Sequence, residues 1–159
     1  MSVFNPNTFL SQETTEVLQT KYTPIPSAEY EAFIDDLKAD TIKTQDGEKP
    51  IMRVTFRLVG AAIDAYRQAM SLSPDAPLTV RQDYWLDLNE QGGFDIGPNK
   101  NVKLGQLRDY VGQNKPGMPW SPAMLKGQGP VLVQVGIYID KRDGETERNE
   151  VKRIGRVIR

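Results

Sequence analysis

Segments of alternating apolar and polar residues, joined by short polar linkers, constrain the fold of this chain more than any other feature of its sequence. The stretch 51-IMRVTFRLVG-60 places apolar side chains at every second position, and 131-VLVQVGIYI-139 is a strongly β-forming run of the same kind. Such alternation is typical of strands with one buried face. The linkers at 45–50 and 140–148 are too short for the crossover that parallel strands need, so we expect antiparallel hairpins.

The rest of the chain completes an order of five strands. Residues 61–72 fit a short amphipathic helix as well as an irregular excursion, and Asn101 is suited to cap a helix over 102–114. The predicted strands cover 28–44, 51–60, 79–88, 131–139 and 149–159. A mainly β chain with five strands, and one helix between the third and the fourth, has the order of an OB-like β-barrel. Another small antiparallel barrel or sandwich would give a similar pattern.

An extended N-terminal arm is predicted at residues 1–27, ahead of a single domain at 28–159. The arm is rich in Asn, Thr, Ser, Gln and Pro, and the stretch 22-YTPIPSAEY-30 that ends it holds two prolines, which favour extended backbone. An arm of this kind is able to join two copies of a chain. A homodimer is therefore one possible state, although the sequence shows no apolar seam of the kind that forms a dimer interface.

The chain of 159 residues contains no Cys and no His. This excludes disulfides, thiolate and histidine metal sites, and nucleophiles activated by histidine. No window approaches 18 apolar residues, and the N-terminus lacks the basic start and apolar core of a secretory signal. We therefore expect a cytoplasmic protein with no membrane contact, which binds rather than catalyses and uses no cofactor.

The net charge of −1 hides an uneven distribution. Residues 1–50 carry four Lys/Arg and nine Asp/Glu, a net charge of −5, whereas residues 51–159 carry sixteen and twelve, a net charge of +4. The last twelve residues hold five basic side chains and one acidic side chain. The overall charge gives no support for nucleic-acid binding, but its distribution permits a local basic surface.

One of the two tryptophans falls on the side of a predicted strand that should face water. In 78-LTVRQDYWLDLNE-90 the apolar side carries Val80, Tyr84, Leu86 and Leu88, and the other side carries Arg81, Asp83, Trp85 and Asp87. Arg53, Thr55 and Arg57 share the polar side of the preceding strand. Single-stranded nucleic acid stacks its bases on aromatic rings and pairs its phosphates with cations. The alternative is that Trp85 packs under a loop while the arginines pair with Asp83 and Asp87.

A second candidate region is the basic closing hairpin. Tyr138 is predicted to point outward from its first strand, where it could stack on a base. A charged edge that prevents pairing with other sheets would have a similar composition. The full set of candidate nucleic-acid-binding residues is Arg53, Arg57, Arg81, Trp85, Tyr138, Lys141, Arg142, Arg148, Lys152 and Arg153.

A nuclease is the enzymatic alternative. Glu150-Val151-Lys152 is an E-x-K triplet on a predicted strand, and Asp140 or Asp143 could supply the second carboxylate that a Mg²⁺ site requires. The triplet is short and the usual β–α framing is missing, so this hypothesis ranks below binding.

Three stretches in this order resemble a bacteriophage family of small single-stranded DNA-binding proteins with an OB-like fold. They are 24-PIPSAEY-30, 52-MRVTFRLVG-60 and 130-PVLVQVGIYIDKRDGETERNEVKRI-154. The resemblance implies sequence-independent binding of single-stranded DNA in phage replication or recombination, inside the infected host, with replication or recombination proteins as further partners. The chain departs from the family pattern at two places. Ser27-Ala28 occupies the position before the first strand where the family commonly has glycine. Many such proteins end in an acidic tail, whereas the last residues here are basic. A virion structural or assembly protein is the alternative from another class.

Overall fold

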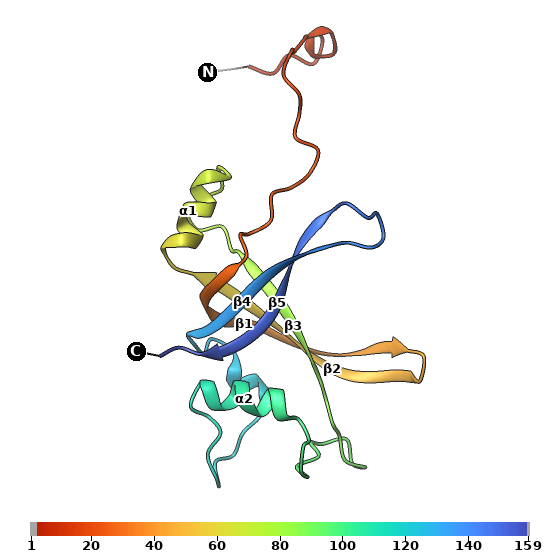
Figure 1. Cartoon of the computed structure of the whole chain (residues 1–159), viewed down its shortest axis with the longest axis vertical. Helices are drawn as coiled ribbons and strands as arrows, with labels where there is room; N and C mark the ends of the chain where they lie inside the picture. The colour runs from red at the N-terminus through yellow and green to blue at the C-terminus, as the bar shows by residue number, and fades with distance from the viewer. Residues whose placement is uncertain (1–2, 159) are drawn as a thin grey trace.

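Five strands form one antiparallel sheet in the order β3-β2-β1-β4-β5 (Figure 1). The structure is a computed structural model that describes residues 3–158; Met1, Ser2 and Arg159, which the predicted arm and closing strand include, lie outside the described residues. The elements are η1 (Phe9–Ser11), β1 (Ala28–Thr44), β2 (Gly47–Val59), α1 (Ala61–Ala69), β3 (Thr79–Trp85), α2 (Val102–Tyr110), η2 (Pro122–Leu125), β4 (Val131–Ile139) and β5 (Glu147–Arg156).

The mainly β, five-stranded antiparallel architecture is confirmed, and so is the helix between the third and fourth strands. Residues 61–69 also form a helix, α1, which decides between the two readings of that segment. β3 and β5 are the two edges of the sheet. They approach each other to Cα–Cα distances of 8 Å or less, but in the described chain no ladder of hydrogen bonds joins them. The sheet is therefore not closed.

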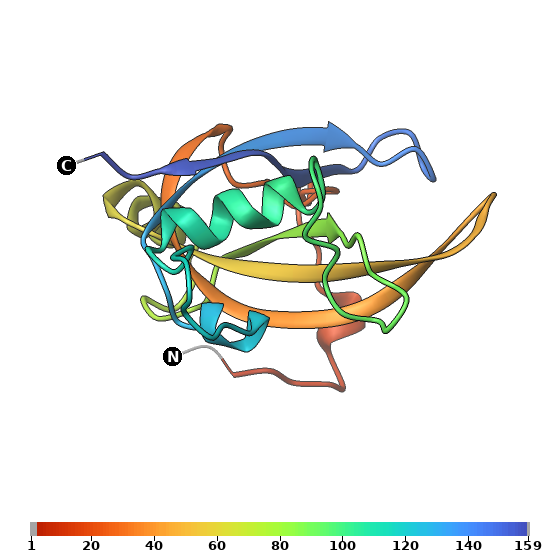
Figure 2. The same ribbon diagram turned by 90° about the horizontal axis from the view of Figure 1, so that it is seen from below.

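The core lies on the inner face of the sheet. Alternate residues of β2 and β4 are buried there, and Phe56 is fully buried among them. Ile63 of α1 and Leu104 and Leu107 of α2 belong to the same cluster. Figure 2 shows α2 lying across the sheet and α1 at one end of it. Truncation of a buried aromatic such as Phe56 to alanine typically costs about 3–5 kcal/mol.

The β1–β2 hairpin projects well beyond the rest of the sheet (Figure 1). Its two strands pair as far as Thr44 and Gly47, but β1 pairs with β4 only through residues 28–32. The predicted turn at 45–50 is too long, because residues 48–50 pair with β1 and the turn itself occupies 45–46. Gly47 follows it with a φ of +107°, a backbone conformation that suits glycine.

β3 ends at Trp85, three residues before the predicted end. Asp87 is tied instead to Asn101: the Asn101 amide NH donates to the Asp87 carboxylate at 2.9 Å, and the Asn101 side chain accepts from the Asp87 NH at 2.9 Å and donates to its carbonyl at 2.8 Å. These bonds replace the strand ladder. Asn101 occupies the N-cap position of α2 as predicted, but its side chain makes no cap hydrogen bond to the helix and bonds to Asp87 instead.

Two of the sequence stretches that carry the resemblance meet in space. Asn149 accepts a hydrogen bond from the Ile25 amide at 2.9 Å and donates one to the Ile25 carbonyl at 2.8 Å. Ile25 is itself buried. The end of the N-terminal arm is therefore clipped to β5 by one side chain.

Residues 3–22 of the arm extend away from the sheet, toward one end of the molecule's long axis (Figure 1). Every one of these residues is exposed, and η1 is the one regular element in this described segment. None of the helices in residues 3–158 is long and apolar enough to cross a membrane.

Candidate nucleic-acid interface

Trp85 lies on the outer face of the sheet and is 58% exposed. On β3 the side chains of Val80 and Tyr84 are buried, whereas Arg81 and Trp85 are exposed. The pairing register sets Trp85 opposite Ile51, Asp83 opposite Arg53 and Arg81 opposite Thr55. The predicted orientation of Trp85 is confirmed. We call the surface made by Arg53, Arg81, Asp83 and Trp85 the β2–β3 face.

The β2–β3 face has an apolar component that the alternation pattern hides. Ile51 is fully buried but stands outside the main core cluster. Because directly opposite residues of an antiparallel pair have neighbouring side chains, Ile51 is expected to lie beside the Trp85 ring. The indole thus has an apolar residue next to it and remains open to solvent.

Arg53 and Asp83 form an ion pair across β2 and β3. The Arg53 Nε lies 2.8 Å from Asp83 Oδ1, and Arg53 NH2 lies 3.2 Å from Oδ2. The hydrogen bond to Asp83 raises the pKa of Arg53 above its usual value. For this arginine the expected alternative, pairing with Asp83, is the arrangement found.

The other two arginines of the predicted surface differ from each other. Arg57 lies 3.7 Å from an Asp35 oxygen and 5.6 Å above the centre of the Phe33 ring. Arg81 is exposed, and within residues 3–158 no acidic side chain pairs with it. Arg81 is therefore the arginine of the β2–β3 face that is available to an anion.

A polar pocket of about 380 Å³ opens between β3 and β5. It brings together three predicted residues, Arg53, Arg81 and Tyr138, although they come from three different strands. Tyr138, which lies on β4, is exposed. The remaining lining residues are Gln82, Asp83, Asn149, Glu150 and Val151. We call this cavity the β3–β5 pocket.

Lys152 and Arg153 line a different, smaller cavity, of about 130 Å³, together with Tyr84 and residues of α2. Lys152 lies 2.9 Å from Glu150, and Arg153 lies 3.0 Å from Glu29. Burial raises the pKa of Tyr84 well above its ordinary value. The two basic residues are therefore paired with acids and separated from the β3–β5 pocket.

The cations of the β4–β5 hairpin gather around one buried carboxylate. Asp140 accepts hydrogen bonds from Arg142 and from Arg148, with nitrogen–oxygen distances of 2.6 and 2.8 Å. The hydrogen bond from the Arg142 side chain is the main reason that the pKa of Asp140 falls far below its usual range. In the described chain Lys141 forms no ion pair. Asp140 therefore neutralises part of the positive charge of the hairpin and holds Arg142 and Arg148 in place.

The three carboxylates of the predicted nuclease site, Glu150, Asp140 and Asp143, all take part in ion pairs or hydrogen bonds. Glu150 pairs with Lys152, Asp140 holds two arginines, and Asp143 accepts hydrogen bonds from Thr146. Among residues 3–158 no three acidic side chains gather as a metal site would require.

Two contributors to this region escaped the sequence patterns. Asn149 lines the β3–β5 pocket while it holds the arm, and Gln82 lines both cavities between β3 and β5. The sequence signal for Asn149 was its place in the stretch 130–154 that carries the resemblance. Gln82 gave none, because a polar residue on the apolar side of a strand is normally counted as an exception to the pattern.

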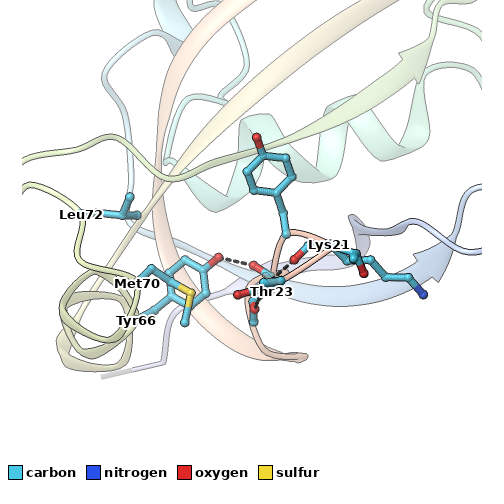
Figure 3. A pocket seen from close by; sticks show the side chains of 8 residues that line it. Lys21, Thr23, Tyr66, Met70 and Leu72 are labelled. Carbon is cyan, nitrogen blue, oxygen red and sulfur yellow. Dashed lines mark hydrogen bonds between the residues drawn. The ribbon is translucent and has the colours of Figure 1, made fainter. Parts of the chain in front are cut away.

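A cavity of about 720 Å³ lies between the arm and α1, and none of the predicted residues line it. Figure 3 shows Tyr66, Met70 and Leu72 on one side and Lys21 and Thr23 of the arm on the other. The Tyr66 hydroxyl donates a hydrogen bond to the Thr23 carbonyl. This contact, with Asn149, fixes the base of the arm.

Neither a protein-family model nor a curated protein sequence matches this chain.

Proposed function

We propose that this protein binds single-stranded DNA, with little sequence preference, across the β2–β3 face and the β3–β5 pocket. The observation that carries the proposal is the exposed Trp85 ring on the same face as the unpaired Arg81. Aromatic rings take stacked bases of any sequence, and a guanidinium group beside them takes the phosphate.

The strand order supports an OB-like barrel as the framework of this site. β3 and β5 stand at the two edges of the sheet yet approach each other, which suits a partly open five-stranded barrel. In OB folds the face of the second and third strands and the loops of the two hairpins bind oligonucleotides. Here the β1–β2 and β4–β5 hairpins project from the sheet (Figure 1).

Ion pairs within the protein reduce the number of cations that are free to contact phosphates. Six of the eight predicted cations are paired with carboxylates: Arg53, Arg57, Arg142, Arg148, Lys152 and Arg153. Phosphate contacts are therefore fewer than the sequence suggests, and stacking on Trp85 and Tyr138 supplies a larger share of the affinity. A role in phage DNA replication or recombination, in the cytoplasm of the infected cell, rests on the resemblance of the sequence motifs alone.

Fluorescence anisotropy with a labelled oligonucleotide tests the proposal. We expect single-stranded DNA to bind more tightly than the duplex of the same sequence, because paired bases cannot stack on Trp85. Equal affinity for the two forms, or no binding at low salt, would contradict the proposal.

The exposed apolar residues of the arm favour one second candidate, a virion structural or assembly protein that makes contacts through residues 3–22. Detection of the protein in purified particles, together with no affinity for oligonucleotide, would favour this role.

A further inference from the structure

The arm carries apolar side chains that nothing in the described chain covers. Leu10 is 95% exposed and Val17 is 96% exposed. Phe4 and Phe9 pack edge to face, with ring centres 5.2 Å apart, and both remain exposed. An exposed apolar group of this kind is typical of a segment that docks on another surface.

A fitting acceptor lies at α2. A pocket of about 240 Å³ is lined by apolar side chains of Phe94, Ile96, Leu104 and Trp120, with Lys100 and Arg108 beside them. The Arg108 guanidinium lies 4.5 Å from the centre of the Trp120 ring. A Cβ atom placed on Gly105 would meet no atom within 4 Å, so the pocket is open above the helix. We call this cavity the α2 pocket.

The charges of the two surfaces are complementary. Residues 3–20 carry Glu13 and Glu16 and no basic residue. The α2 pocket carries Lys100 and Arg108 against the single acid Asp95. An acidic, apolar segment therefore matches a basic, aromatic pocket.

The positions of the arm and the α2 pocket indicate that the two interacting surfaces come from different copies of the chain. The arm leaves the molecule at one end of its long axis, and α2 lies toward the opposite end (Figure 1). The base of the arm is fixed by Tyr66 and Asn149. We propose that the arm of one copy docks into the α2 pocket of the next copy, head to tail. A contact between two different surfaces does not close on itself unless the rotation happens to complete a ring, so the chains form open arrays.

Sedimentation velocity of the full chain without DNA tests this inference independently of DNA binding. The average mass of the wild-type protein should rise with concentration. The double variant Phe9→Ser and Leu10→Ser should stay monomeric, because its arm loses the two neighbouring apolar anchors in η1. Gly105→Leu should also stay monomeric, because the new side chain fills the α2 pocket.

Gly105→Ala is the matched control, since a methyl group leaves the pocket open and a helix tolerates alanine better than glycine. It should associate like the wild type. An equal mixture of the arm variant and Gly105→Leu should form heterodimers and no larger species. The arm of the Gly105→Leu chain can enter the intact pocket of the arm variant, but no second arm and pocket remain to extend the array. A wild-type protein that stays monomeric at every concentration, or a Gly105→Leu variant that still associates, would overturn the inference.

Discussion

Arg53 and Asp83 lie directly opposite each other on β2 and β3 and share two hydrogen bonds, so the arginine diagonally across from Trp85 is already neutralised. The carboxylate would also repel a phosphate on the β2–β3 face. We therefore predict that Asp83→Asn strengthens oligonucleotide binding. Exposed ion pairs are worth about 0.2–1 kcal/mol, which corresponds to a gain of roughly 1.5- to 5-fold.

Asp75→Asn is the control for this prediction. Asp75 lies in the loop before β3, accepts a hydrogen bond from Ser73, and gives the same change of net charge away from the site. It should leave the affinity nearly unchanged. Weaker binding by Asp83→Asn would mean that Asp83 positions Arg53 for the DNA.

Arg81 should account for a measurable part of the salt dependence. Each phosphate contact to a single strand contributes about −0.7 to the slope of log K against log salt concentration. Arg81→Gln should make the slope shallower by about 0.7, because it removes one free cation from the β3–β5 pocket. The same substitution at Arg153, which pairs with Glu29 outside that pocket, should have a smaller effect. Equal slopes for Arg81→Gln and wild type would remove Arg81 from the interface.

The β4–β5 hairpin should lose stability in acid. Hydrogen bonds from the Thr146 side chain and backbone and the Glu145 NH lower the pKa of Asp143 to about 2, against about 3.9 in an unfolded chain. A depressed pKa in the folded state stabilises the fold above about pH 4, and this contribution is lost as the pH falls toward 2. Asp140, with its lowered pKa, acts in the same direction.

Thermal unfolding between pH 6 and pH 2 measures this contribution. Asp143→Asn cannot titrate, so its midpoint should fall less steeply below pH 4 than that of the wild type. Parallel curves for the two proteins would show that the carboxylate of Asp143 does not stabilise the folded state.

Asn149 should contribute to stability through the arm. Its two hydrogen bonds to Ile25 are part-buried, and a typical hydrogen bond contributes about 0.5–1.5 kcal/mol. Asn149→Ala should therefore lower the free energy of unfolding in urea by about 1–3 kcal/mol. Asn149→Asp keeps the acceptor for the Ile25 NH but turns a carboxylate oxygen toward the Ile25 and Gly136 carbonyl oxygens, so it should not restore the stability that alanine loses. An alanine variant as stable as the wild type would contradict the role of the clip.

Local patterns were enough to predict the strands. Alternation in β2 and β4, and the short linker between the first two strands, depend on neighbouring residues, so sequence alone located these elements. The end of β3 depended on a hydrogen bond between Asp87 and Asn101, which are fourteen residues apart, and the pattern continued past it. Ile137 and Ile139 illustrate the same limit: they alternate with the buried valines of β4 but are partly exposed, because β4 extends past the core there.

The candidate site was predictable in orientation but not in charge. The alternation of β3 correctly placed Trp85 outward and Tyr84 inward. The charge state of the surface depended on which acid faces which base across strands. Asp35 meets Arg57 because of the register of β1 against β2, and Glu29 meets Arg153 across β4 because of the β1–β4 and β4–β5 registers. A count of lysines and arginines along the chain could not predict that neutralisation.

Quenching of Trp85 fluorescence by unlabelled single-stranded DNA tests the central claim most directly. Stacking of a base on an indole quenches its emission, and the chain has two tryptophans. The second, Trp120, donates a hydrogen bond of 2.8 Å to Gln113 and lines the α2 pocket, so it does not belong to the β2–β3 face. We predict that Trp120→Phe keeps the quenching and that Trp85→Phe loses it. Trp85→Ala should also weaken binding by about 1–3 kcal/mol while the protein stays folded. Quenching that persists in Trp85→Phe, with unchanged affinity in Trp85→Ala, would contradict the account.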